Sequence, residues 1–156
     1  MNISTKTQYG MRAMVHLARQ SKSRSSTEIA SAEHIPTDFL EKILQNLKRA
    51  GLVRSARGVS GGYLLAHPPR RITARDIVTA LEKPLSNVQC LEEKTCPRQD
   101  TCATKDVWTD LQRSLFSTLS SITLADLIRD KKKVTSRQKK SAHPKKIRSR
   151  RTARIN

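Results

Sequence analysis

Apolar residues recur at three- and four-residue spacing through the first fifty positions, and this pattern predicts three helices. The first helix spans residues 3–20, and its apolar face consists of Met11, Met14, Val15 and Ala18, widened by Tyr9 and Leu17 and weakened by Gly10. The second helix begins near Ser25, because Ser25 and Glu28 have the spacing of a capping box. It ends at Ile35 and Pro36, and Ile29 and Ala32 are expected to face inward.

The third helix spans about residues 36–50, and Gly51 follows it as a left-handed C-cap. Its apolar stripe consists of Phe39, Leu40, Ile43, Leu44 and Leu47. Two short helices separated by a tight turn, the second ending in Lys48 and Arg49, are typical of a helix-turn-helix. An ordinary three-helix core has the same pattern, so the residues that follow decide between the two.

The next segment predicts a two-stranded hairpin. Residues 52–56 and 63–66 have the character of strands, and the turn at residues 57–62 contains three glycines. A helix-turn-helix followed by a hairpin is a winged helix-turn-helix, so the predicted fold class is mainly α with a two-stranded wing. The wing tip carries Arg57 beside Ser60 and Gly61, and a thin cationic loop of this kind can enter the minor groove of DNA. A solvated charge on a plain hairpin loop is the alternative for Arg57.

Beyond the wing, Thr73 and Asp76 have capping-box spacing and open a helix through residues 74–82. Residues 85–104 have no helical or strand period, and a stretch of this length inside a compact chain is functional or disordered. A long helix follows at residues 105–129, with an apolar stripe of Trp108, Leu111, Leu115, Leu119 and Ile122. This stripe is longer than a small core needs, so we expect a homodimer, with packing against residues 3–20 as the alternative.

The chain therefore divides into a winged helix-turn-helix DNA-binding domain at 1–83, a cysteine-bearing loop at 84–104, a dimerisation helix at 105–130 and a basic tail at 131–156. Lysine and arginine number 31 against 13 acidic residues, a formal net charge of +18. The tail has very few apolar residues and no acidic residue, so we expect it to be disordered. It is either a solvated extension or a non-specific DNA-binding arm.

A large positive charge implies a polyanionic partner, and double-stranded DNA is the expected one. No apolar run approaches the roughly 18–20 residues that span a bilayer. The N-terminus also lacks the basic and apolar regions of a signal peptide, so we expect a cytoplasmic protein with no membrane partner. No phosphate-binding loop or nucleophile–base set stands out, and neither an enzyme nor a small-molecule substrate is expected.

All three cysteines, Cys90, Cys96 and Cys102, lie in the irregular segment, with five residues between neighbours. Three thiols cannot all form disulfides within one chain, and the cytosol keeps thiols reduced. Zinc prefers four ligands that include a close cysteine pair, which this spacing lacks, whereas iron–sulfur clusters tolerate wider spacings. An iron–sulfur cluster is therefore the favoured cofactor, and three unrelated thiols are the alternative. Candidates for a fourth ligand are Glu92, Glu93, Asp100, Asp106 and His16.

The order of these parts resembles the iron–sulfur winged-helix transcriptional regulators of the IscR, NsrR and RirA type. The matching segments are YGMRA at 9–13, IPTDFLEK at 35–42, LKRAGLV at 47–53 and RGVSGGY at 57–63, together with the three cysteines. The resemblance covers about residues 1–130 and implies a homodimer whose cluster state alters its affinity for DNA. It also implies that Thr37, Asp38 and Glu41 read bases, that Arg57 enters the minor groove, and that Cys90, Cys96 and Cys102 bind the cluster.

Two positions depart from the pattern of the resembled regulators. One branch has a histidine ligand three residues after the last cysteine, where this chain has Lys105. Another branch has an acidic ligand near position 8, where this chain has Gln8. These departures favour an oxygen-labile 4Fe–4S cluster on three cysteines over a 2Fe–2S cluster.

The sequence therefore predicts a homodimeric transcriptional regulator whose affinity for a palindromic operator is switched by an iron–sulfur cluster sensing iron, oxygen or nitric oxide. One alternative is a metal-free regulator in which Cys90 or Cys96 is oxidised directly. The other is a non-specific nucleic-acid-packing protein that acts through its basic tail.

Overall fold

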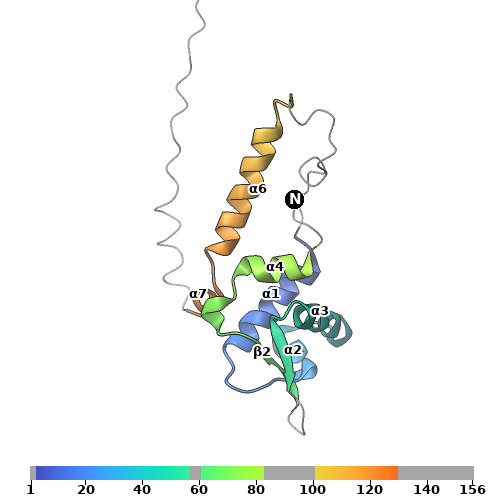
Figure 1. Ribbon diagram of the computed structural model, residues 1–156. Helices are drawn as coiled ribbons and strands as arrows, with labels where there is room; N and C mark the ends of the chain where they lie inside the picture. Colours follow the sequence, from blue (N-terminus) through green and yellow to red (C-terminus); the bar gives the residue numbers. More distant parts are fainter. Residues whose placement is uncertain (1–2, 57–60, 83–100, 130–156) are drawn as a thin grey trace, which may run out of the picture.

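Helix α1 (Thr5–Ala18) lies at the centre of the computed structural model, which describes residues 3–56, 61–82 and 101–129. Along the chain follow α2 (Ser26–Glu33), α3 (Thr37–Arg49), β1 (Val53–Ala56), β2 (Gly62–Leu65), the 3-10 turn η1 (Pro69–Arg71), α4 (Ala74–Leu81), α6 (Lys105–Ser120) and α7 (Leu124–Ile128). Figure 1 shows the helices α1 to α4 as a bundle, with the two-stranded sheet at one end and α6 projecting from the other. This is the predicted winged helix-turn-helix.

The hydrophobic core forms where α3 and α4 pack on α1. Its fully buried side chains come from five helices and include Met14, Ile29, Leu40, Ile43, Leu44, Leu47, Ile77, Leu81 and Leu124. Gly10 faces this core, and a Cβ atom there would overlap Leu81 and lie 3.3 Å from Ile43. The glycine that the sequence presents as a weak spot in α1 is therefore what allows α4 to approach α1 closely.

Two predicted core positions are wrong. In α2 the buried pair is Ile29 and Ala30, while Ala32 is exposed, because the face of α2 that meets the core is centred on Ile29 and Ala30. In α3 the aromatic ring of Phe39 remains 37% exposed. That ring packs edge-on against Tyr9 at the margin of the core, with 5.9 Å between the ring centroids.

The wing is an antiparallel hairpin in which Val53 pairs with Leu65 and Ala56 pairs with Gly62. A third segment joins its edge, because the backbone of Arg24 pairs with Tyr63 in both directions at 3.0 and 2.7 Å. The sequence pattern does not predict this pairing, because Arg24 lies between the first two predicted helices. A Cβ atom on Gly62 would collide with the backbone of Arg24, so a residue with a side chain would push this third segment away.

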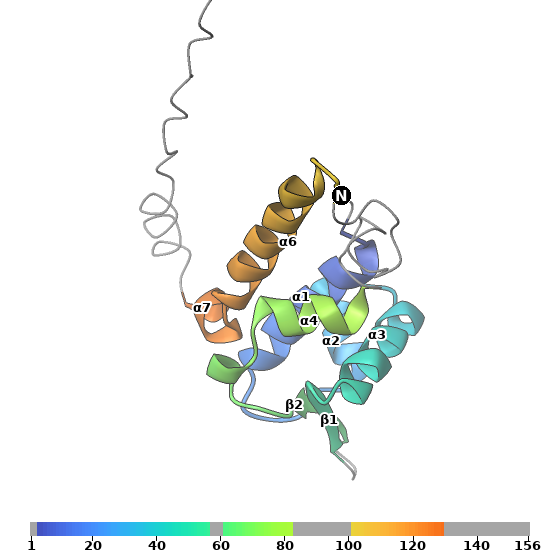
Figure 2. The ribbon, with the colours of Figure 1, turned by 45° about the horizontal axis from the view of Figure 1, so that its top comes forward.

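The predicted single helix over residues 105–129 is wrong, because the structure has two helices there. Thr123 and Asp126 form a capping box that starts α7, and the chain is extended at Thr123 with a ψ angle of 161°. Helix α7 buries Leu124 in the core. Helix α6 packs mainly against α4, and the N-terminal end of α6 lies away from the bundle (Figures 1 and 2). Within the described part of the chain, no helix has the length and apolar character needed to cross a membrane.

Candidate nucleic-acid interface

Helices α2 and α3 form the helix-turn-helix, and three residues make the turn between them. His34 adopts the left-handed conformation, with φ 51° and ψ 52°, and ends α2. Ile35 is buried at 5% exposure and fixes the turn to the core. Pro36 then precedes Thr37, the first residue of α3, and its extended backbone directs α3 across the face of the molecule.

Helix α3 has two faces of opposite character. One face is completely buried and consists of Leu40, Ile43, Leu44 and Leu47. The other face is exposed at Asp38, Glu41, Lys42, Gln45, Lys48 and Arg49, with Thr37 half-buried at its start. The structure therefore places Thr37, Asp38 and Glu41 together on the first two turns. Lys48 and Arg49 lie at the other end of the helix, next to the wing.

Two exposed hydrogen bonds link α3 to neighbouring elements. The Ser26 hydroxyl, in the first turn of α2, donates a hydrogen bond to Glu41 Oε1 at 2.9 Å. At the opposite end of α3, Lys48 Nζ donates to Ser55 Oγ on β1 at 3.0 Å. The exposed face of α3 is thus tied to the first helix of the motif and to the wing.

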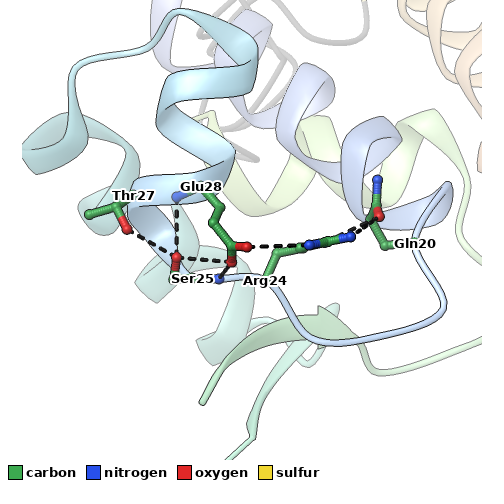
Figure 3. Close-up of polar contacts among 5 residues, drawn as sticks. All are labelled: Gln20, Arg24, Ser25, Thr27 and Glu28. Atoms are coloured by element: carbon green, nitrogen blue, oxygen red, sulfur yellow. Dashed lines mark hydrogen bonds and ion pairs between the residues drawn. The ribbon is translucent and has the colours of Figure 1, made fainter. Parts of the chain in front are cut away.

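A polar network fixes the segment that joins α1, the wing and α2 (Figure 3). The guanidinium group of Arg24 donates to Gln20 Oε1 at 2.8 and 3.2 Å and to Glu28 Oε1 at 3.2 Å. Ser25 caps α2, because its hydroxyl accepts from the Glu28 N–H while its own N–H donates to the Glu28 carboxylate at 2.7 Å. The hydrogen bond from the Ser25 N–H, followed by those from its hydroxyl and from Arg24, lowers the pKa of the Glu28 carboxyl.

Only part of the predicted wing site is described. Gly61 is half-buried and directly precedes β2, and Arg54 is exposed on β1. Arg57 and Ser60 lie outside the described residues. The described part of the hairpin stands beside the C-terminal end of α3, as a winged helix requires for contact with two neighbouring grooves.

The predicted cysteine site is described at one residue only. Cys90 and Cys96 lie outside the described residues, whereas Cys102 lies just before α6, with its sulfur 3.3 Å from Thr104 Oγ1. Lys105 opens α6 and its N–H donates to the Cys102 carbonyl at 3.2 Å. Within residues 3–56, 61–82 and 101–129, no three potential metal ligands converge. Among the candidate fourth ligands, His16 places Nδ1 3.1 Å from Glu33 Oε1, and Asp106 is exposed in the first turn of α6.

The C-terminal end of α4 is fixed to the N-terminus of α1. The backbone N–H and the hydroxyl of Ser4 both donate to Glu82 Oε1, at 2.9 and 2.7 Å. Partial burial raises the pKa of the Glu82 carboxyl, but the hydrogen bonds from Ser4 and Thr7 and the positive charge of Lys6 outweigh burial and hold that pKa below its ordinary value. Glu82 therefore joins the end of α4 to the first residues of α1.

The sequence pattern indicates the two helices and the wing but not the contacts between them. Ser26, Arg24 and Glu82 have no local signal for their roles, because each contacts a partner at least 15 residues away in the sequence. The one usable signal is Gly62, immediately before Tyr63. A glycine inside a strand indicates that another backbone segment lies close to it, and here that segment is Arg24.

Comparison with known proteins places this geometry among transcriptional regulators. The model of the Rrf2 family, described as an iron-dependent transcriptional regulator, matches residues 3–130. The chain is 36% identical over 133 residues to protein rrf2 of Nitratidesulfovibrio vulgaris, covering 83% of this chain and 89% of that protein.

Two solved structures show a similar fold over most of their length. T. potens IscR matches with a TM-score of 0.69 and 37% identity, over 83% of this chain and 88% of that one. CymR, the global cysteine regulator of B. subtilis, matches with a TM-score of 0.69 and 35% identity, over 82% of this chain and 96% of that one. The part of the chain that the family model matches, residues 3–130, contains every described helix and strand and all three cysteines.

Proposed function

This chain belongs to the Rrf2 family of DNA-binding transcriptional regulators, and from that premise we propose that it is a homodimer whose affinity for a palindromic operator is switched by an iron–sulfur cluster. The observation that carries the DNA-binding part is the exposed face of α3 beside the wing, over a fully buried opposite face. A helix presented in this way fits the major groove of B-DNA.

The proposed contacts follow from where the side chains lie. Thr37, Asp38 and Glu41 meet base edges in the major groove, since they occupy the first turns of α3. Lys48 and Arg49 neutralise phosphates at the other end of that helix. Arg57, Ser60 and Gly61 form the wing contact, with Arg57 in the minor groove.

The proposed dimer interface is the outer face of α6. Val107, Trp108 and Leu111 are 60%, 38% and 50% exposed, and Val107 and Leu111 are one helical turn apart. Apolar side chains gathered on one helix face favour a second copy of the chain. A two-fold dimer places two copies of α3 on two half-sites of a palindrome.

The proposed cluster ligands are Cys90, Cys96 and Cys102. Thiolates are the usual ligands of iron–sulfur clusters, and the family description as iron-dependent supports this donor set. When bound, the cluster supplies redox- and ligand-sensitive iron, with 4Fe–4S favoured and 2Fe–2S possible. Cys102 lies at the N-terminal end of α6, where the backbone N–H groups favour a negatively charged ligand set.

Helices α4 and α6, which precede and follow the cysteine-bearing segment, contact each other and the helices of the DNA-binding domain. Glu82 holds the N-terminus of α1 through Ser4, and Leu81 packs against Gly10 of the same helix. Arg75 of α4 lies 4.5 Å from the ring centroid of Phe116 and so couples α4 to α6. A change in the segment would therefore move α6 against α1 and alter the spacing of the two reading helices, provided that the two arrangements bind the cluster unequally.

Anaerobic purification of the full chain tests the cluster. The proposal predicts iron, acid-labile sulfide and a visible charge-transfer band, all reduced strongly in the Cys102→Ser variant. Ser86→Ala, in the same segment, is the matched control and should retain them. A wild-type chain without iron or sulfide contradicts the cluster proposal.

A second candidate function is metal-free thiol sensing. The similarity to CymR, a cysteine regulator, favours this candidate. It predicts that peroxide changes DNA affinity in iron-free protein and that Cys90→Ser or Cys96→Ser abolishes the response.

Deletion of residues 131–156 tests non-specific packing, because a chain that still binds a palindromic site without its tail is a sequence-specific regulator.

A further inference from the structure

A single hydrogen bond joins the first turn of α2 to the exposed face of α3. The hydroxyl of Ser26 donates to Glu41 Oε1 at 2.9 Å, across 15 residues of sequence. Glu41 is exposed, and Ser26 is half-buried at the first position of α2. Because a carboxylate has two oxygen atoms, a donor on Oε1 leaves Oε2 able to accept another hydrogen bond.

The position of Ser26 is itself fixed by its neighbours. Ser25 forms the capping box with Glu28, which sets the start of α2. Arg24 is held to β2 by two backbone hydrogen bonds to Tyr63, and its side chain bridges Gln20 and Glu28 (Figure 3). The close contact of this backbone with Gly62 allows no side chain between them. The Ser26 hydroxyl is therefore anchored to the wing as well as to α2.

We propose that Ser26 positions the Glu41 carboxylate for base recognition, so that α2 contributes to operator specificity without touching a base. This inference rests on the proposed DNA-binding function. A glutamate in the major groove accepts a hydrogen bond from the N4 amino group of cytosine. An unrestrained glutamate side chain loses rotamer freedom when it makes such a bond, and the Ser26 contact removes part of that cost before DNA binds.

The test compares the sequence preferences of matched variants of the full chain. In vitro selection from a randomised double-stranded DNA library first defines the preferred site of the wild type. Fluorescence anisotropy then measures Kd for duplexes that each change one base pair of that site, and for an unrelated duplex. The variants are Ser26→Ala, Ser26→Thr and Glu41→Ala, with Ser31→Ala as the control, since Ser31 is an exposed serine on the same helix.

The expected result is that Glu41→Ala and Ser26→Ala relax discrimination at the same base pair, Ser26→Ala by roughly tenfold. Ser26→Thr, which keeps the hydroxyl, and Ser31→Ala should retain the wild-type profile. Affinity for the unrelated duplex should stay unchanged in the three serine variants, which a general loss of folding would not allow.

Three results would overturn the inference. If Glu41→Ala relaxes the preference and Ser26→Ala does not, Glu41 reads DNA without help and the proposed function stands. If Ser26→Ala weakens every duplex in the same proportion, Ser26 has only a structural role. If the wild type selects no preferred site, the inference and the proposed operator binding both fail.

Discussion

Thr73 and Thr123 pair as an antiparallel bridge, and each is the N-cap of the helix that follows it. The two threonine hydroxyls accept from Asp76 N–H and Asp126 N–H, both at 3.2 Å. Backbone hydrogen bonds flank the bridge, from Ala74 to Ile122 at 2.8 Å and from Leu124 to Ile72 at 2.9 Å. The starts of α4 and α7 are therefore fastened to each other, and this joins the C-terminal helices to the winged helix.

Replacement of Thr123 by alanine should lower the free energy of unfolding by about 1 kcal/mol, because it removes the cap of α7. Urea denaturation followed by circular dichroism measures this change. Thr118→Ala, at an exposed position of α6, is the control and should leave the free energy of unfolding nearly unchanged. Equal stability of the two variants would show that the Thr123 cap contributes nothing.

The bridge between Thr73 and Thr123 also shows what local sequence patterns can predict and what they cannot. Thr73 with Asp76 and Thr123 with Asp126 have the same spacing, yet the pattern predicts a cap at the first site and a continuous helix at the second. Apolar residues continue from the stripe at Trp108–Ile122 to Leu124, Leu127 and Ile128, so the pattern predicts one helix, whereas the structure forms the cap. Burial of Leu124 in the shared core decides the outcome, and that is a tertiary effect.

The candidate site divides in a similar way. Periodicity predicts the apolar and exposed faces of α3, with Lys48 and Arg49 at its end, whereas Thr37, Asp38 and Glu41 are indicated as base-reading residues only by the family resemblance. The contact of Ser26 with Glu41 and the pairing of Arg24 with Tyr63 join distant segments. Helical and strand periods describe one element at a time, so they do not carry this information.

Replacement of Gly10 by alanine should destabilise the protein, although alanine is the better helix former. The added methyl group would overlap Leu81 in the contact between α1 and α4. Overpacking costs about 1–3 kcal/mol and the gain in helix propensity is roughly 1 kcal/mol, so we expect a net loss of up to about 2 kcal/mol. A double-mutant cycle with Leu81→Ala checks the cause, since trimming Leu81 should make the second loss smaller. Strict additivity would argue against a direct clash.

Replacement of Glu82 by glutamine should destabilise the protein in a pH-dependent way. The pKa of the Glu82 carboxyl lies below its ordinary value of 4.5, so its ionised form stabilises the folded state above pH 4.5. That contribution is lost as the pH falls through the lower pKa of the folded state. At neutral pH the free energy of unfolding of the wild type should therefore be about 1 kcal/mol higher than that of Glu82→Gln. The neutral glutamine side chain accepts weaker hydrogen bonds from Ser4 than the charged carboxylate does.

Unfolding curves for wild type and Glu82→Gln across the acid range measure this difference. The difference in the free energy of unfolding between the two proteins should become smaller as the pH falls below 4.5. Asp110→Asn, which changes a carboxylate that is 68% exposed on α6, should show no comparable gap. A gap that is constant with pH would mean that the charge of Glu82 is unimportant.

A glutamate in place of Leu111 should separate the proposed dimer. Leu111 is 50% exposed in a single chain, so the change costs little for folding but buries a charge in the α6 interface. Sedimentation velocity should report half the wild-type mass. Ser117→Glu, on another side of the same helix, should leave the mass unchanged. A Leu111→Glu chain that sediments like the wild type would place the interface elsewhere.

In the proposed mechanism, binding of an iron–sulfur cluster at the cysteine site changes the affinity of the protein for DNA. Fluorescence anisotropy on one anaerobic preparation, before and after chelation of its iron, measures that coupling directly with the selected operator duplex. We expect a change in Kd of about 5- to 150-fold, the usual range of an allosteric coupling. The change should be absent in Cys102→Ser. An unchanged Kd after complete loss of iron would contradict the proposed mechanism.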